Sequence, residues 1–216
     1  MRLRPAPAPD DMRTSLALSY DAAAERREAM GEADWRWPIA DGLLEMVRRE
    51  GKTRLLEIGA GVGFTSRWFT DRGLDVVATD LSPAQVELCR AKGLEAYVSD
   101  MGDLPFAPGS FDAIWAMNCV HHVPTTEFDA VLAGIADVLV AGGLFYLGVW
   151  GGVDQEGIFE DDFYPPPRFF ALRSDATLRT AVEPVFTVES FATFTPEVDR
   201  DDDGLHMQSM LLRKPG

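Results

Sequence analysis

Residues 55–64 read Leu-Leu-Glu-Ile-Gly-Ala-Gly-Val-Gly-Phe, and this stretch decides the fold of the chain. Its apolar start, Leu55 to Ile58, is typical of a short strand buried in a parallel sheet. Glycines follow at three alternate positions. Because glycine has no Cβ, the backbone there can turn sharply and lie against a ligand. Helical spacing begins at Thr65. Strand, glycine turn and helix together predict a nucleotide site at the carboxyl edge of a parallel sheet.

The glycine spacing resembles the first motif of class I S-adenosylmethionine-dependent methyltransferases, in which glycines alternate after an acid. A dinucleotide-binding fingerprint would have its third glycine where Phe64 stands. A plain structural turn of an α/β protein is the alternative interpretation of the glycines. The resemblance implies S-adenosyl-L-methionine as the cofactor, bound in part by these residues: Glu57, Gly59, Ala60, Gly61 and Gly63.

The resemblance also implies the fold. We expect an α/β domain with a doubly wound, Rossmann-like sheet of seven strands, mostly parallel, with a C-terminal antiparallel hairpin. Residues 51–216 would form this S-adenosylmethionine-binding domain. The hairpin strands are expected at Val185–Phe194 and Leu205–Arg213, joined by an acidic loop. Methyl transfer to a small-molecule acceptor is the expected activity, through an oxygen, nitrogen, sulfur or carbon nucleophile.

A second predicted strand, Asp75–Thr79, ends at Asp80 and leads into a helix. Ser82 is placed to cap that helix, with Gln85 completing a capping box. Asp80 follows the glycines by about twenty residues, where an acid binds a ribose in this fold. The resemblance implies that Asp80 accepts hydrogen bonds from both ribose hydroxyls, with Leu81 beside it in the cofactor site.

Two more strand ends complete the predicted cofactor site. The strand Glu95–Ser99 leads to Asp100 and Met101. In the family an acid here accepts from the adenine amino group, while an apolar neighbour stacks on the ring. The strand Ala113–Met117 ends at Asn118. Parallel strands bring their carboxyl ends to one edge of a sheet, so these side chains are expected to share a rim.

His121 and His122 follow the fourth strand and are the candidate catalytic bases. A histidine titrates near neutral pH, so either could take a proton from a hydroxyl or thiol acceptor. The alternative is a structural pair, with one ring packed and the other capping. The transfer itself does not require a base, because positioning the acceptor about 3 Å from the methyl group supplies much of the rate.

The N-terminal region divides into two parts. Residues 1–11 contain a Pro-Ala repeat and are expected to form a flexible tail. Residues 12–50 are expected to be helical, with Ser19-Tyr20-Asp21 starting a helix through Ala22–Met30. Tyr20 is assigned either to a lid over the cofactor or to packing of this segment on the core.

Two later segments are read from their pattern. Apolar residues at helical spacing predict a helix from Phe128 that Gly142-Gly143 ends, with Thr125 or Thr126 as its cap and a strand at Leu144–Trp150. A long irregular connection over 151–173 carries several aromatic residues, which suit either a substrate pocket or ordinary packing. A short helix, Ser174–Val182, is expected next.

Composition excludes several classes of function. The formal net charge of −15 opposes binding to nucleic acid or to an anionic membrane. No apolar run reaches membrane-spanning length. The two cysteines have no CxxC spacing, so we expect a reducing, cytoplasmic compartment and neither a disulfide framework nor a metal site. A monomer or homodimer is expected.

Three alternatives to a small-molecule methyltransferase stay open. One is a tRNA wobble-uridine-type methyltransferase, which would need a positive surface stripe. Another is an NAD-dependent oxidoreductase, in which Asp80 would bind the NAD ribose. The last is a non-catalytic protein that only binds the cofactor. Exocyclic amines of nucleobases are disfavoured as acceptors, because Asn118 is followed by Cys-Val-His rather than by Pro-Pro-Tyr or Pro-Pro-Phe.

Overall fold

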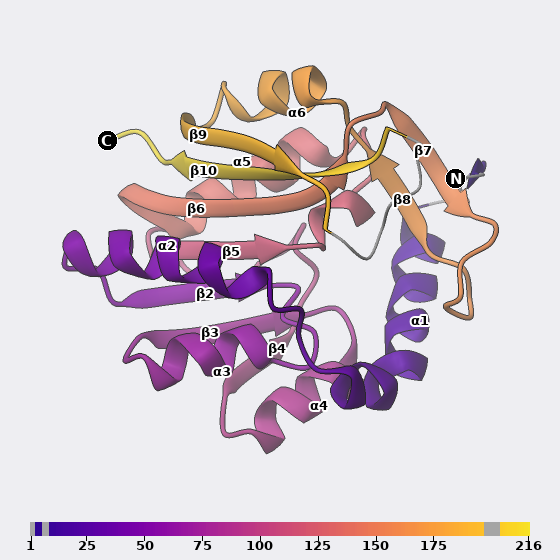
Figure 1. Ribbon diagram of the computed structural model, residues 1–216, viewed down its shortest axis with the longest axis horizontal. Coiled ribbons are helices and arrows are strands. Elements are labelled where there is room, and N and C mark those ends of the chain that lie inside the picture. The colour runs from indigo at the N-terminus through magenta and orange to yellow at the C-terminus, as the bar shows by residue number, and fades with distance from the viewer. Residues whose placement is uncertain (1–2, 6–8, 197–203) are drawn as a thin grey trace.

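Residues 3–5, 9–196 and 204–216 are described by the computed structural model. A seven-stranded sheet crosses its centre (Figure 1). The strands are β2 (Arg54–Ile58), β3 (Asp75–Asp80), β4 (Glu95–Val98), β5 (Phe111–Met117), β6 (Leu139–Gly151), β9 (Thr187–Phe194) and β10 (His206–Arg213). Their order is β4-β3-β2-β5-β6-β10-β9. The first five strands in this order, from β4 through β3, β2 and β5 to β6, are parallel to one another, whereas β10 runs antiparallel to both β6 and β9. The predicted fold class is therefore confirmed.

Helices cover both faces of this sheet. They are α1 (Pro9–Met30), α2 (Arg36–Arg49), α3 (Phe64–Asp71), α4 (Pro83–Ala91), α5 (Phe128–Val138) and α6 (Asp175–Val182), with a 3-10 turn η1 at Val120–His122. Helices α2 and α3 pack on one face, and α5 and α6 on the other. Helix α1 stands across the carboxyl ends of the parallel strands (Figure 1).

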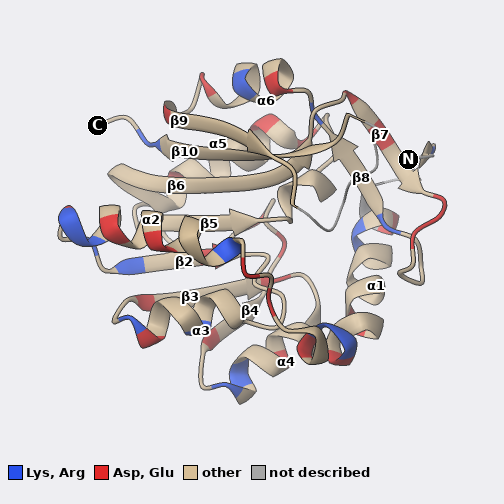
Figure 2. Cartoon of the chain, in the orientation of Figure 1, with Lys and Arg blue, Asp and Glu red and all other residues tan. Residues whose placement is uncertain are grey.

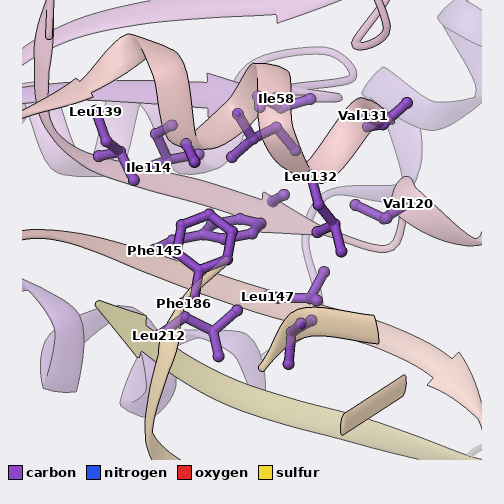
Figure 3. Packing of buried hydrophobic residues seen from close by; sticks show 14 of the residues in the cluster. Ile58, Ile114, Val120, Val131, Leu132, Leu139, Phe145, Leu147, Phe186 and Leu212 are labelled. Atoms are coloured by element: carbon purple, nitrogen blue, oxygen red, sulfur yellow. The ribbon is translucent and has the colours of Figure 1, made fainter. Parts of the chain in front are cut away.

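Alternation along the strands produces these two cores. Leu55 faces α2 and α3, whereas Leu56 and Ile58 face α5. Figure 3 shows Ile58 in the α5 core beside Val131 and Leu132. Burying each such side chain contributes roughly 1.5–3 kcal/mol, which holds the strand end rigid. Charged residues are dispersed over the helices and turns, while β6 contains none (Figure 2).

Helix α1 differs from the prediction. It begins at Pro9, so Ser19-Tyr20-Asp21 lies inside it and does not start a helix. No proline or glycine interrupts the helix after Pro9, and a proline is tolerated at a first turn. Asp21 contributes to a different helix, because its carboxylate accepts from Ser82 Oγ and, at 3.0 Å, from the backbone N–H of Ala84. Asp21 thereby joins α1 to the start of α4.

A second, smaller sheet was not predicted. Strands β1 (Leu3–Arg4), β7 (Gln155–Phe159) and β8 (Phe169–Leu172) pair in the order β1-β7-β8. The connection over 151–173 is therefore partly regular, and two residues of the expected tail pair with it. Local patterns miss this sheet because its strands are short and β1 is more than a hundred residues away from β7.

Two predicted ends of a helix and one predicted capping interaction are also wrong. Helix α5 ends at Val138 and β6 follows at once, so Gly142-Gly143 lies within a strand. Glu127 stands at the helix start without a side-chain cap, in place of either threonine. Ser82 does cap α4, but the Gln85 amide donates to the carbonyl of Tyr20, 3.3 Å away, rather than completing a capping box.

Other parts of the chain agree with prediction or lie outside the structure. Helix α6 agrees with the predicted helix over Ser174–Val182, except that Ser174 is its N-cap, whose hydroxyl accepts from the N–H of Thr177. The expected acidic loop lies in 197–203, outside the described residues. In the described parts of the chain, no helix is both long and apolar enough to cross a membrane. The division of the chain into a tail (1–11), a helical segment (12–50) and a cofactor-binding domain (51–216) stays a prediction.

Candidate active site

A cavity of about 1130 Å³ opens at the carboxyl ends of the parallel strands, between these ends, α1 and the small sheet. A typical small-molecule pocket has roughly 300–1,000 Å³, so this cavity has room for a cofactor and an acceptor. Most predicted site residues line it: Tyr20, Gly59, Ala60, Gly61, Asp80, Leu81, Asp100, Met101, Asn118, His121 and His122. Glu57 and Gly63 do not line it.

The three glycines of the turn have different roles. Gly59 and Gly61 have φ of 69° and 59°, in the left-handed region that glycine adopts at least cost. A Cβ on Gly59 would lie 2.4 Å from the Cβ of Cys119, so no larger residue fits. A Cβ on Gly63 would meet the Cys89 Sγ at 2.8 Å. Gly63 therefore allows the helices to pack, while Gly59 and Gly61 form the cavity wall.

Asp80 is held by two backbone groups. Its Oδ2 accepts from the N–H of Gly61 at 2.8 Å, and its Oδ1 accepts from the N–H of Ser82 at 2.9 Å. Burial raises the pKa of Asp80, and these two N–H groups oppose that rise. A carboxylate oxygen can accept more than one hydrogen bond. Asp80 can therefore hold the glycine turn and still accept from two hydroxyl groups of a ligand.

Asp100 follows β4 and is already paired. Its Oδ1 accepts from the N–H of Gly102 at 2.8 Å, and its Oδ2 lies 2.5 Å from the Nε of Arg13 on α1. Arg13 also pairs with Glu127. The carboxylate expected to accept from an adenine amino group is thus bridged to α1, with Met101 lining the cavity next to it.

Glu57 lies behind the glycine turn. Its side chain is 2% exposed and accepts a hydrogen bond from Ser66 Oγ on α3. Burial raises the pKa of Glu57 to about 8, and the nearby Arg36 guanidinium opposes this rise. Arg36, which sequence reasoning missed, lines the cavity from the start of α2. An arginine at the cavity wall beside this turn suits a ligand end that carries a carboxylate group.

Several buried polar atoms at the cavity have no hydrogen-bond partner among the described residues. They include Arg27 Nε, Gln85 Oε1, Asn118 Oδ1 and His121 Nδ1. Leaving a buried polar group unsatisfied costs about 1–3 kcal/mol, so natural structures rarely retain such atoms without a ligand or water. Their gathering on one cavity is expected of a binding site whose ligand supplies the missing bonds.

His122 is held as a neutral ring. Its Nδ1 lies 2.6 Å from the carbonyl oxygen of Phe169, which can only accept, so Nδ1 carries the proton. Its Nε2 therefore accepts from the Tyr20 hydroxyl at 2.8 Å, and that hydroxyl accepts from Arg168 Nη1 at 3.1 Å. Burial lowers the pKa of His122 to about 3. Because its lone pair is already engaged, His122 is poorly placed to take a proton from an acceptor.

His121 differs from its neighbour. Its ring is 3% exposed and stacks on Phe170, with 5.1 Å between centroids. Burial lowers its pKa well below the usual value, so the ring is neutral at pH 7. Its Nδ1 is the unpartnered atom noted above, and the residue lines the cavity. A neutral imidazole of this kind can accept or donate one hydrogen bond to a bound ligand.

Residues 56–147 match a family model described as a methyltransferase domain. By this match, residues 56–147 of this chain are a methyltransferase domain. The match begins within β2 and ends within β6, so the domain includes the strand ends that supply Glu57, Asp80, Asp100 and Asn118. The alternative of an NAD-dependent oxidoreductase has no support from this match.

Two curated relatives are similar to the methyltransferase domain. Methyltransferase GfsG of Streptomyces halstedii is 34% identical over 134 residues, which are 58% of this chain and 44% of that protein. A malonyl-[acyl-carrier protein] O-methyltransferase of Herminiimonas arsenicoxydans is 32% identical over 110 residues, which are 50% of this chain and 42% of that protein. The alignments therefore span less than half the length of these relatives.

A solved structure shows the same fold over nearly the whole chain. It is a Burkholderia thailandensis 1,6-didemethyltoxoflavin-N1-methyltransferase with bound 1,6-didemethyltoxoflavin and S-adenosylhomocysteine. The two share a TM-score of 0.75 at 23% identity, with 99% of this chain and 93% of that chain covered. At this identity the likeness shows that the two chains share a fold.

The outer wall of the cavity comes from segments that sequence reasoning left open. Aromatic residues of the β7–β8 region line it, so at least part of this region forms a pocket wall: Phe159, Phe163, Tyr164, Phe169 and Phe170. Arg27 and Arg168 also line it and were missed. An arginine in a polar helix or loop gives no periodic signal, so only the tertiary structure brings these two together. In the described residues, no group of three or more His, Cys, Asp or Glu side chains is arranged to hold a metal ion.

Proposed function

We propose that this protein is an S-adenosylmethionine-dependent methyltransferase that moves a methyl group to a nucleophilic atom of a small-molecule acceptor. The observation that carries the proposal is the common cavity. Asp80, Asp100 and Asn118 reach it from three strand ends, and unpartnered polar atoms face it. The family match supports the cofactor class.

The residues present fit the cofactor along its whole length. Asp80 would accept from the ribose hydroxyls, and Asp100 from the adenine amino group once Arg13 yields an oxygen. Arg36 would bind the carboxylate of the amino-acid end, while Glu57, buried behind the turn, would hold the turn against α3 through Ser66. When bound, the cofactor supplies an electrophilic methyl group on a sulfonium.

The part of the cavity that the β7–β8 region lines would hold the acceptor. Phe163, Tyr164 and Phe170 give it aromatic walls, and His121 offers a hydrogen-bonding nitrogen. Helix α1 and the small sheet cover the site and would exclude water. The protein's main task is to align the acceptor's lone pair with the methyl carbon at about 3 Å, since such positioning supplies much of the rate.

Location and assembly belong to the proposal as well. We propose a cytoplasmic enzyme, monomeric or homodimeric, with no nucleic-acid partner. The formal net charge of −15 supports the last point, because nucleic-acid binding needs a basic surface.

Calorimetric titration with S-adenosylhomocysteine tests the cofactor, and labelled methyl transfer to a panel of phenols, ring N–H compounds, thiols and amines tests the activity. Saturable binding with transfer to at least one acceptor is expected. No binding at millimolar ligand contradicts the proposal. Binding without transfer to any of a wide range of metabolites indicates a non-catalytic binding protein, and transfer to tRNA alone indicates the nucleic-acid alternative.

A further inference from the structure

Tyr164, in the connection between β7 and β8, lies among arginines. Its side chain is 4% exposed and lines the cavity. Arg27 Nη1 donates a hydrogen bond to its hydroxyl oxygen at 3.1 Å. The guanidinium carbons of Arg168 and Arg26 lie 3.7 and 4.7 Å from its ring centroid. Three cations therefore surround one phenol, in a chain whose formal net charge is −15.

Only part of this positive charge is balanced locally. Asp162 pairs with Arg168 through two hydrogen bonds, of 2.8 and 2.9 Å, and also accepts from the Tyr164 backbone N–H at 3.3 Å. For the described parts of the chain, no carboxylate lies within ion-pair distance of Arg27 or Arg26. Arg27 also interacts electrostatically with Glu32 and Asp80, and the Tyr20 ring lies 5.5 Å from that of Tyr164 between centroids. The phenol oxygen of Tyr164 therefore faces an excess of positive charge.

Tyr164 is also close to the cofactor end of the cavity. A Cβ on Gly61 would lie 3.6 Å from Arg27 Nη2, while the other terminal nitrogen of that guanidinium bonds to the Tyr164 hydroxyl. One side chain thus spans the distance between the glycine turn and the phenol oxygen. His122, by contrast, has both ring nitrogens engaged by Tyr20 and Phe169.

We propose that Tyr164, as a phenolate, is the general base that removes the acceptor's proton. This inference rests on the proposed methyl transfer. The phenolate oxygen takes the proton from the acceptor's O–H or N–H group, and the electron pair left behind forms the new bond to the methyl carbon. The pair of the broken carbon–sulfur bond stays on sulfur, and Tyr164 later releases its proton to solvent. Each transfer thus balances without a further reactant.

The assignment narrows the class of acceptor. Proton transfer is efficient when the base and the group it deprotonates have comparable pKa values. A phenolate stabilised by arginines matches phenols, enols and acidic ring N–H groups, and it is too weak a base for aliphatic alcohols. The aromatic rings around Tyr164 suit flat acceptors of this kind.

The pKa of each tyrosine shifts in the direction that its neighbours predict. Burial alone would raise the pKa of Tyr164, but the charges of Arg27 and Arg168 outweigh it, so that this pKa is lowered. The other tyrosines shift the opposite way: burial raises the pKa of Tyr20 and raises that of Tyr146 to about 12, and a hydrogen bond to Glu95 raises that of Tyr97. Tyr164 is therefore expected to ionise first when the pH is raised.

Near-ultraviolet absorbance of tyrosinate tests this in the full-length protein, with no acceptor required. We expect one tyrosine to ionise below the usual pKa of about 10, and this early step to be lost in Tyr164→Phe. The matched control, Tyr97→Phe, should keep it. In Arg27→Gln the early step should move up by about one pH unit or more. This second variant retains Tyr164, so it tests the assignment even if Tyr164→Phe does not fold.

Binding of S-adenosylhomocysteine to the same samples separates the two proposals. Tyr164→Phe should bind it with little change but lose at least tenfold in kcat, together with the acidic limb of the pH–rate profile. An early ionisation that persists in Tyr164→Phe, or that does not move in Arg27→Gln, overturns the base assignment while leaving the methyltransferase proposal intact. Failure of wild-type protein to bind S-adenosylhomocysteine overturns both.

Discussion

Replacing Asp80 with alanine removes the group expected to hold the cofactor's ribose. The carboxylate is half-buried and its orientation is fixed by the N–H groups of Gly61 and Ser82, at 2.8 and 2.9 Å. A hydrogen bond to a charged group contributes about 1.5–3 kcal/mol. The Kd for S-adenosylhomocysteine should therefore rise roughly 10- to 150-fold, as measured by isothermal titration calorimetry.

The same change also removes an acceptor from two backbone N–H groups. Unfolding free energy should fall by about 1–3 kcal/mol, so binding must be measured at a temperature where circular dichroism shows a folded variant. Asp75→Asn is the matched control. Asp75 lies at the other end of β3, exposed and 3.5 Å from Arg54, and should leave the Kd unchanged. An unchanged Kd in Asp80→Ala, or an equal loss in Asp75→Asn, refutes the ribose assignment.

Three further predictions concern the glycine turn and the acid behind it. Gly59→Ala places a Cβ 2.4 Å from that of Cys119 at a φ of 69°, so its melting temperature should fall; an unchanged value contradicts the close packing. In Gly61→Val the added Cβ would lie 3.0 Å from Gln85 Oε1, and the side chain would enter the cavity. Calorimetry should show weaker binding of S-adenosylhomocysteine, while the far-ultraviolet circular dichroism spectrum is unchanged. Full affinity would contradict the place of Gly61 in the cavity wall. Burial raises the pKa of Glu57 from 4.5 to about 8, so the folded state retains this proton and its stabilising effect is lost as pH rises through that range. Glu57→Gln cannot ionise, so thermal melts should show it gaining stability relative to wild type as the pH rises from about 4.5 to about 8, with no further gain above pH 8; a pH-independent difference counts against this.

The sequence predicts the strand ends well because their signals are local. Asp80 follows an apolar run and precedes a serine and a proline that start a helix, so its place at the rim can be worked out from a dozen residues. Leu55 and Ile58 are buried on opposite faces, as expected for a strand within a covered sheet. The glycine turn could be placed for the same reason.

The cover of the site could not be predicted, since its contacts join distant residues. Arg13 reaches Asp100 and Glu127, and Tyr20 reaches His122, across more than eighty residues of chain. No periodicity records such contacts. The capping signal at Ser19 to Asp21 was misleading for a related reason, because Asp21 caps α4 rather than its own helix.

The roles of the histidines also depended on tertiary contacts. A histidine pair after a strand is chemically suited to be a base, and nothing local shows that Phe169 and Tyr20 bind both nitrogens of His122. Sequence reasoning offered no ground for proposing Tyr164 as a base, because a tyrosine in a loop carries no catalytic pattern. Only the structure shows the three arginines around it.

A crystal structure of this protein with S-adenosylhomocysteine would show which residues hold the adenosyl group. We expect the ribose hydroxyls within hydrogen-bond distance of Asp80, the adenine amino group on Asp100 in place of Arg13, and the amino-acid end over Gly59 and Gly61. Ligand density elsewhere, or an adenosyl group bound without contact to Asp80 and Asp100, would contradict this expectation.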